Sequence, residues 1–137
     1  NDGFCHVHKS IHSEDVKKAK ELHPDALVLA HPECTSDTLA LADFIGSTSQ
    51  IIDYATASDS KKFLICTEMG VFYELMQKNP DKKFFSVGHR QFCPNMKKVS
   101  LDKVLEKLED LKDEVILPEE MCEQAKKPLD EMLRLAQ

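Results

Sequence analysis

The sequence has no hydrophobic run long enough to cross a membrane, no signal-peptide pattern and no block of basic residues. The first two absences argue against a membrane protein and a secreted protein. The third, together with a formal net charge of −6 at pH 7, argues against nucleic-acid binding. We therefore expect a cytoplasmic protein whose partners include neither nucleic acid nor membranes.

The cysteines are numerous, but they form neither a disulfide framework nor a zinc motif. Their total of five is odd, and no two of them make a Cys-x-x-Cys pair. Free cysteine packs readily in protein cores, so a small buried hydrophobic residue is the more common role for any one of them. The cysteines stand at positions 5, 34, 66, 93 and 122.

The overall composition of the chain is ordinary for one compact domain. The chain has 137 residues, of which 42% are hydrophobic and 31% charged. A domain of this size can bury a core without help from metals or disulfides. The sequence begins at Asn1 rather than at a methionine, directly before an apolar segment. We expect it to be a piece of a longer protein.

Residues 26–30, Ala-Leu-Val-Leu-Ala, are the centre of the predicted fold. Five apolar residues bounded by polar ones predict a strand buried on both faces. Pro32 ends this strand, and His31 and Glu33 follow at its carboxyl end, where ligands bind in open α/β sheets. Both are therefore candidate functional residues. An ordinary strand-end histidine with a satisfied hydrogen bond remains an equal interpretation of His31.

The rest of the pattern alternates short apolar runs with helical periodicity, which is typical of βαβ units with right-handed crossovers. We predict a three-layer αβα sandwich with a parallel four-stranded sheet over residues 3–92. The loops that follow the strands contain Cys, His or Glu and should share one edge of this sheet. The predicted strands are 3–8, 26–30, 62–66 and 83–87, and helices should begin near residues 13, 36, 48 and 71.

Residues 47–50, Ser-Thr-Ser-Gln, predict a helix start with a capping box. Free backbone N–H groups beside the hydroxyls of Ser47 and Thr48 could also bind an anion. A plain helix cap is the more common role of such a motif.

The C-terminal part should be a separate extension. We predict an αβα domain over residues 1–93 and a helical extension over 94–137 with one short strand at 114–117. Leucines at helical spacing after Ser100 predict one helix, and Pro118 should begin another that Pro128 kinks.

Five motifs appear in an order that resembles one enzyme family. Together they are similar to the carboxyl-terminal part of quinolinate synthase, the iron–sulfur enzyme of bacterial, archaeal and plastid NAD biosynthesis. The resemblance extends over essentially the whole chain, including the terminal helices. The motifs are GFCHVH at 3–8, HPEC at 31–34, AD at 42–43 with GSTSQII at 46–52, TEMG at 67–70 and CPNMK at 93–97.

The resemblance implies an activity, a cofactor and an architecture. Quinolinate synthase, a transferase, condenses iminoaspartate with dihydroxyacetone phosphate, and loss of phosphate and two waters gives quinolinate. Three similar αβα domains each contribute one cysteine to a [4Fe–4S] cluster, whose fourth iron stays open as a Lewis acid. An L-aspartate oxidase or dehydrogenase would supply iminoaspartate, in the cytoplasm or, in plants, the plastid.

The resemblance also implies roles for residues. Cys5 and Cys93 match two cluster ligands, and the third cysteine ligand is expected upstream of this chain. Because two cysteines cannot hold such a cluster stably, we expect the chain alone to be inactive. Glu33 and His31 match catalytic residues, while Cys34, Cys66 and Cys122 are expected to be structural. The implied substrate-binding residues are His31, Pro32, Glu33, Ser47, Thr48 and Met96.

Two other classes of function stay open beside this one. The first is a non-catalytic α/β ligand-binding or interaction module. The presence together of His31, Glu33, Thr48, Cys5 and Cys93 argues against a decayed enzyme. The second is a metal hydrolase that uses His6, His8 and His31. No His-x-x-x-His helix and no adjacent pair of carboxylates supports the second class.

Overall fold

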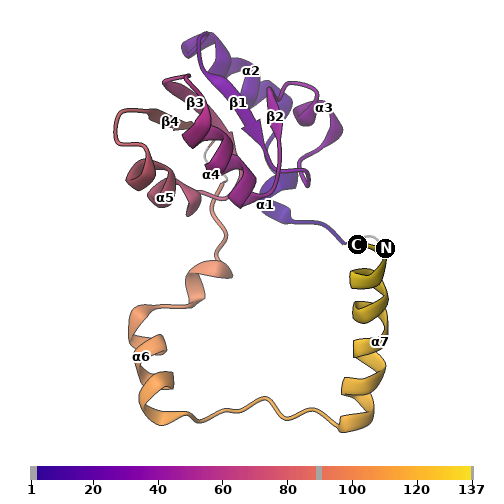
Figure 1. Cartoon of the computed structure of the whole chain (residues 1–137). Helices are drawn as coiled ribbons and strands as arrows, with labels where there is room; N and C mark the ends of the chain where they lie inside the picture. Colours follow the sequence, from indigo (N-terminus) through magenta and orange to yellow (C-terminus); the bar gives the residue numbers. More distant parts are fainter. Residues whose placement is uncertain (1–2, 89–90, 137) are drawn as a thin grey trace. The chain divides into compact units, whose positions relative to one another are not determined.

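The computed structural model describes residues 3–88 and 91–136 (Figure 1). The chain divides into two compact units, Asn1–Lys97 and Lys98–Gln137. We call the first the sheet unit and the second the helical unit. No helix in the described ranges is both long and apolar enough to cross a membrane.

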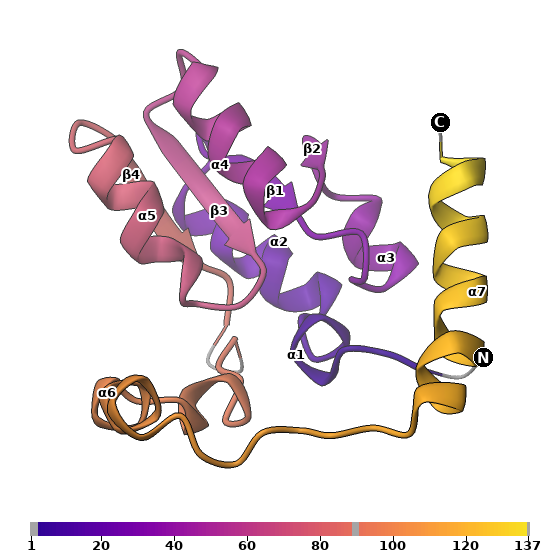
Figure 2. The same ribbon diagram turned by 60° about the horizontal axis from the view of Figure 1, so that its bottom comes forward.

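The sheet unit contains four parallel strands in the order β2-β1-β3-β4 (Figures 1 and 2). The two central strands, β1 and β3, pair from Leu27 with Phe63 to Ala30 with Cys66. Strands covered on both faces are expected to be continuously apolar, as β1 is throughout and β3 is after Lys62. The predicted α/β fold with a parallel four-stranded sheet is confirmed. The strands are β1 (Leu27–Ala30), β2 (Phe44–Ile45), β3 (Lys62–Cys66) and β4 (Lys83–Ser86).

Helices cover both faces of this sheet. Because successive side chains of a strand point to opposite faces, Val28 and Leu64 pack in one core cluster, whereas Leu29 and Phe63 pack in the other. Helix α2 (Ser13–Leu22) contributes Val16 to the first cluster. Helices α4 (Thr48–Ala57) and α5 (Val71–Lys78) contribute to the second. The unit is therefore layered as helix, sheet and helix.

The strand predicted at residues 3–8 is wrong. That segment enters a short helix, α1 (His6–Lys9), in which the N–H of Lys9 donates to the carbonyl of Cys5 at 3.0 Å. This turn buries both Val7 and His8, and Phe4 before it is exposed. A single helical turn is too short to show a helical period in the sequence.

The fourth strand is instead β2, in a segment where no strand was predicted. The preceding helix, α3 (Ser36–Leu39), begins where predicted and is a single turn. Asp43 then aligns β2 with β1, because its N–H donates to the carbonyl of Val28 at 2.8 Å and its carboxylate accepts from the N–H of Val28 at 2.7 Å. A strand of two residues is too short to leave a periodic pattern in the sequence.

The helical unit contains α6 (Leu101–Asp110) and α7 (Glu119–Leu135), and a short 3₁₀ turn at Met96–Lys98 precedes them. The strand predicted at residues 114–117 is wrong: the described segment between the helices is extended but pairs with no strand. Its apolar side chains lack a neighbouring strand to cover them, and Val115 is 83% exposed. Helix α7 continues through Pro128.

Candidate functional site

The order of the strands defines the edge at which a site can form. From β1 the chain moves outward to β2, and it then returns to the other side of β1 to form β3. The loops after β1 and β3 therefore diverge from each other, and in open α/β sheets ligands bind in such a crevice. The N–H of His31, after β1, donates to the carbonyl of Cys66, at the end of β3, at 3.2 Å. The predicted residues His31 and Glu33 lie at this switch point.

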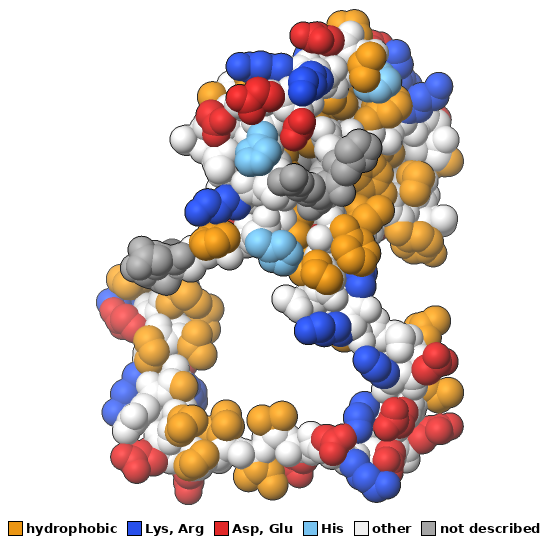
Figure 3. Space-filling view, turned by 180° about the vertical axis from the view of Figure 1, so that it is seen from behind, with side chains coloured by type: hydrophobic (Ala, Val, Ile, Leu, Met, Phe, Trp, Pro, Cys, Tyr) orange, Lys and Arg blue, Asp and Glu red, His pale blue; other side chains and the backbone are white. Residues whose placement is uncertain are grey.

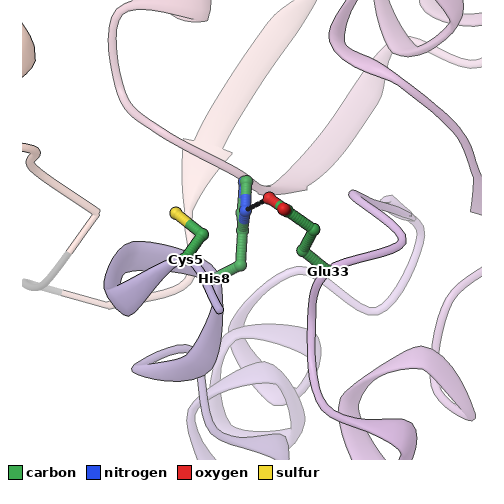
Figure 4. A group of neighbouring side chains, drawn as sticks. All are labelled: Cys5, His8 and Glu33. Carbon is green, nitrogen blue, oxygen red and sulfur yellow. Dashed lines mark hydrogen bonds and ion pairs between the residues drawn. The ribbon is translucent and has the colours of Figure 1, made fainter. Parts of the chain in front are cut away.

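His8 connects the two diverging loops. Its Nδ1 lies 2.8 Å from Glu33 Oε2, in the loop after β1 (Figure 4). Its Nε2 lies 2.9 Å from Thr67 Oγ1, in the loop after β3. His8 and Thr67 are both buried, whereas the side chain of Glu33 is 51% exposed. A carboxylate, an imidazole and a hydroxyl in one hydrogen-bonded row is the arrangement by which hydrolases move a proton.

His31 lies flat against His8. The two rings are stacked with their centroids 4.1 Å apart and their planes 4° apart. The N–H of Glu33 donates to His31 Nδ1 at 3.3 Å, which leaves the proton of a neutral His31 on Nε2. Burial, and next the proximity of His8, lower the pKa of His31 below its ordinary value, and the carboxylate of Glu33 opposes this only in part. His31 therefore favours the neutral form.

Cys5 lies beside the same histidine. It is the residue immediately before α1, and its sulfur, a ring nitrogen of His8 and a carboxylate oxygen of Glu33 all lie within 4.8 Å of one another (Figure 4). Thiol, imidazole and carboxylate are all metal-binding groups. Among the described residues, His6 and His31, which the hydrolase alternative requires, do not join this group.

Cys93 is held on the same edge of the sheet by Glu68. One carboxylate oxygen of Glu68 accepts from the N–H of Cys93 at 3.1 Å, and the other accepts from the N–H of Gly70 at 2.6 Å. Lys97 pairs with this carboxylate at 3.1 Å. Burial raises the pKa of Glu68, but these backbone and lysine contacts outweigh it, so the pKa is below its ordinary value. Glu68 follows Thr67 directly, which places Cys93 close to the carboxyl end of β3.

Gln91 holds the same loop from its other side. Its buried amide Nε2 donates to the carbonyls of Ile65 at 2.6 Å and Thr67 at 2.7 Å, and its Oε1 accepts from the N–H of Val87 at 2.9 Å. A side-chain amide with such contacts holds the ends of two strands together. Gln91, two residues before Cys93, thus connects the end of β3 with the residue that follows β4.

The remaining cysteines have different surroundings. Cys34 is buried and its thiol lies 3.4 Å from the carbonyl of Cys66. Burial raises the pKa of Cys34 to about 11 and that of Cys66 to about 12, so both stay protonated at neutral pH. Cys122 is exposed in α7. Since metal ligation requires the thiolate, neither buried thiol is a favoured ligand.

The structure brings Thr48 and Met96 together. Both line a pocket of about 360 Å³ that also borders Thr67 and Glu68. Ser47 forms the predicted capping box, in which its hydroxyl accepts from the N–H of Gln50 at 3.4 Å and its own N–H donates to Gln50 Oε1 at 2.8 Å. Its hydroxyl is therefore engaged in the cap. Pro32 is exposed in the turn between His31 and Glu33.

Comparison with known proteins identifies the family of this chain. The family described as Quinolinate synthetase A protein matches residues 1–134. The chain belongs to this family.

Relatives in the quinolinate synthase family match nearly the whole chain. The quinolinate synthase of Caldicellulosiruptor bescii is 52% identical over 134 residues, which cover 98% of this chain and 44% of that protein. Quinolinate synthase 2 of Methanosarcina acetivorans is 46% identical, with 98% and 43% covered. The quinolinate synthase of Aquifex aeolicus is 40% identical, with 98% and 43% covered. The chain thus spans less than half the length of these relatives.

The cysteine thiols of this chain fit part of an iron–sulfur site. The sulfur of Cys5 lies beside His8 and Glu33, and the backbone of Cys93 is hydrogen-bonded to Glu68 in the loop after β3, while Cys34 and Cys66 are buried thiols with raised pKa values. Thiolates anchor such clusters, normally four per cluster or three with one iron left open. The described residues therefore fit a cluster only if a further thiolate comes from outside them.

His8 and Thr67 are the site residues that the sequence did not single out. His8 was named only as a ligand of the hydrolase alternative, and the TEMG motif assigned no role to Thr67. Each lies on a different segment from Glu33, and no spacing in the sequence connects the three. A usable signal was present only in Cys5-x-x-His8, in which two metal-binding groups stand one helical turn apart.

Proposed function

We propose that this chain supplies the carboxylate–histidine part of a quinolinate synthase active site. In that role it contributes to the condensation of iminoaspartate with dihydroxyacetone phosphate and to the loss of phosphate and two waters. The observation that carries the proposal is the hydrogen-bonded row of Glu33, His8 and Thr67 at the switch point of the sheet, beside Cys5. Family membership over residues 1–134 supports it.

The reaction requires several proton transfers, which Glu33 and His8 are arranged to perform. A [4Fe–4S] cluster on Cys5, Cys93 and an outside thiolate would supply a Lewis acid for a substrate oxygen or nitrogen. Glu33 is half-exposed, so it can reach a substrate while its other side contacts His8 Nδ1. The hydroxyl of Thr67 holds the far nitrogen of His8 and thereby fixes the orientation of the ring.

His31 is suited to bind substrate rather than to carry charge. Its lowered pKa favours the neutral ring, and its Nδ1 is occupied by the N–H of Glu33. The Nε2–H can therefore donate to a substrate carboxylate or carbonyl. Pro32, between His31 and Glu33, restricts the backbone of this turn and keeps the two side chains in register.

Both substrates are anionic, and the start of α4 offers a place for one of their charged groups. Thr48 is the first residue of this ten-residue helix and lines the pocket of about 360 Å³ with Met96. Helix N-termini attract phosphates and carboxylates. We assign a phosphate or carboxylate contact to Thr48 and to the O–H of Ser47, whose oxygen acts as an acceptor in the cap, and we assign the apolar wall to Met96. An L-aspartate oxidase or dehydrogenase would supply the iminoaspartate.

A chimeric enzyme tests this proposal. Residues 1–137 replace the matching portion of the Caldicellulosiruptor bescii relative, and the unsubstituted chimera is the reference. In it, Glu33→Gln should leave the visible absorption of the cluster intact and lower quinolinate formation by about 10²–10⁴-fold, the usual range for loss of a general acid or base. Adding His8→Ala should lower it little further, because residues that act as a unit are not additive.

The controls separate proton transfer from cluster binding. Cys5→Ala in the chimera should lose iron and sulfide after anaerobic reconstitution, whereas Cys34→Ser should retain both. The chain by itself is expected to be inactive. Near-normal turnover of Glu33→Gln would exclude this carboxylate from the chemistry.

A further inference from the structure

We infer that Glu68 is a positioning residue for the proposed reaction. Its carboxylate holds two parts of the site against the start of α5: Cys93, the proposed cluster ligand, and the turn that carries Met96, the apolar wall of the substrate pocket. The inference rests on the proposed function for the roles of Cys93 and Met96. The contacts of Glu68 itself can be tested without that function.

The carboxylate of Glu68 accepts backbone N–H groups from two separate segments. Its Oε1 accepts from the N–H of Cys93 at 3.1 Å, and its Oε2 accepts from the N–H of Gly70 at 2.6 Å. The N–H of Met69 donates to the carbonyl of Gln91 at 2.8 Å, so a backbone bond joins the same two segments. Only 12% of the Glu68 side chain is exposed, and hydrogen bonds to a charged group are stronger where water is largely excluded.

Lys97 extends this arrangement to the far end of the turn. Its Nζ lies 3.1 Å from Glu68 Oε1 and 3.2 Å from Oε2, and its N–H donates to the carbonyl of Cys93 at 3.3 Å. Met96 directly precedes Lys97. Because one carboxylate contacts both Cys93 and Lys97, the residues between them cannot shift without breaking one of these contacts. The positions of Cys93 and Met96 therefore depend on the same side chain.

Gly70 provides the space in which the carboxylate and the ammonium group meet. A Cβ atom at residue 70 would lie 2.7 Å from Glu68 Oε2 and 3.1 Å from Lys97 Nζ, so it would overlap with the oxygen. The φ of Gly70 is −60°, which any residue can adopt. Close approach, and not backbone conformation, is thus what requires glycine here. Gly70→Ala should displace the carboxylate while it keeps both charged side chains.

The same contacts shape the substrate pocket. Glu68 and Gly70 line the pocket of about 360 Å³ together with Thr48 and Met96. Displacement of the carboxylate should therefore disturb Cys93 and the pocket at once. We expect loss of Glu68 to weaken both cluster retention and substrate binding, which a residue that only stabilised the fold would not do.

Alkylation of the reduced chain by iodoacetamide tests the contacts of Glu68. Mass spectrometry follows Cys93, which reports opening of the turn, and Cys66, which is fully buried in β3 and reports unfolding of the sheet unit. Glu68→Gln and Gly70→Ala should each raise the alkylation rate of Cys93 by about 5–100-fold, the range that corresponds to a lost hydrogen bond to a charged group. Because Gly70→Ala keeps the charges, an effect of charge on thiol reactivity cannot explain its result.

Asp43→Asn is the matched control for the alkylation experiment. The carboxylate of Asp43 also accepts from a backbone N–H, that of Val28 at 2.7 Å, but it lies before β2. This variant should raise the rate of Cys66 and leave that of Cys93 unchanged. If Asp43→Asn accelerated Cys93 as much as Glu68→Gln does, or if Glu68→Gln left Cys93 unchanged, the inference would be overturned.

Variants of Lys97 measure the contribution of the ion pair. Lys97→Arg keeps the charge and should alkylate at Cys93 as the unaltered chain does, whereas Lys97→Met should accelerate Cys93. In the Glu68→Gln background, Lys97→Met should add little, because both changes remove the same interaction. Independent, additive effects of the two changes would show that the ion pair does not hold the turn.

The chimera connects the contacts of Glu68 with the reaction. Partners that support a metal ligand are worth about 10–100-fold in metal affinity or activity, so Glu68→Gln should retain less iron at limiting iron and should raise the KM for dihydroxyacetone phosphate. Asp43→Asn should retain the iron content of the reference. Normal iron content and KM in Glu68→Gln would overturn the inference and leave the proposed function intact. If alkylation responds as described but the reference chimera forms no quinolinate, Glu68 still positions Cys93 and the proposed function fails.

Discussion

Both units of the chain contain helices with one apolar side, but within residues 3–88 and 91–136 only the sheet unit buries that side. In the sheet unit, α4 places Ile51 and Ala55 in a core where neither is exposed. In the helical unit, every described residue is exposed, and Figure 3 shows hydrophobic side chains on the surface of this unit. Leu108 of α6 is 70% exposed. Helices with an amphipathic sequence pattern therefore have a buried apolar face in the sheet unit and an exposed apolar face in the helical unit.

This difference shows where the stability of the described structure comes from. Helices of about ten residues are marginal in water, and in proteins most of their stability comes from packing of the apolar face. The sheet unit supplies that packing on both faces of its sheet, whereas the described residues of the helical unit do not. Equivalent substitutions in the two units should therefore have unequal effects.

The largest difference is expected for an apolar side chain. Phe63 in β3 is fully buried, so Phe63→Ala should lower the free energy of unfolding by about 3–5 kcal/mol through lost burial and a cavity. Leu108→Ala in α6 should change it by less than about 0.5 kcal/mol. Urea unfolding followed by circular dichroism measures both. A comparable loss in Leu108→Ala would show that α6 buries this face after all.

A smaller difference between the units is expected when a carboxylate is replaced, and this difference in stability should depend on pH. Glu68→Gln removes a charged acceptor from the N–H groups of Gly70 and Cys93 and should cost about 1–3 kcal/mol at pH 7. The folded state lowers the pKa of Glu68 below its ordinary value of 4.5. The stabilisation is therefore complete above this value, and it disappears as the pH falls through the lower pKa of the folded state.

Unfolding midpoints from pH 7 to pH 3 test this expectation. The curves of the unaltered chain and Glu68→Gln should converge at low pH. Glu131→Gln in α7, where Arg134 lowers the pKa of an exposed carboxyl, should leave the midpoint unchanged at every pH. If the difference in unfolding midpoint between Glu68→Gln and the unaltered chain stayed constant down to pH 3, the stabilising role assigned to the charge of Glu68 would be wrong.

The smallest difference is expected at helix caps. The hydroxyl of Ser47 accepts from the N–H of Gln50 in the capping box of α4, so Ser47→Ala should cost about 1 kcal/mol. Ser100 precedes α6 but makes no side-chain cap bond, and Ser100→Ala should cost less than about 0.5 kcal/mol. If urea unfolding showed equal losses in the free energy of unfolding for both variants, the two serines would contribute equally to stability.

Much of the fold could be predicted from local signals. The apolar runs of β1 and β3 and the capping box before α4 each lie within a few adjacent residues, so their structure can be inferred from the sequence. α1 and β2 could not, because a single helical turn and a two-residue strand are too short to show a period. The segment 114–117 shows the opposite error: an apolar run predicted a strand, but a strand requires a partner to pair with.

The sequence by itself determined the type of fold and the two residues, His31 and Glu33, that follow a buried strand. It did so because burial and the end of a strand are local properties of a few neighbouring residues. Only the tertiary structure decided that His8 lies between Glu33 and Thr67, which are separated from it by 25 and 59 positions. It also decided that Cys5 shares that site whereas Cys34, adjacent to Glu33, faces the core. Hydrogen bonds and ligand sets of this kind join distant segments, and the strand order that brings these segments together leaves no mark in their spacing.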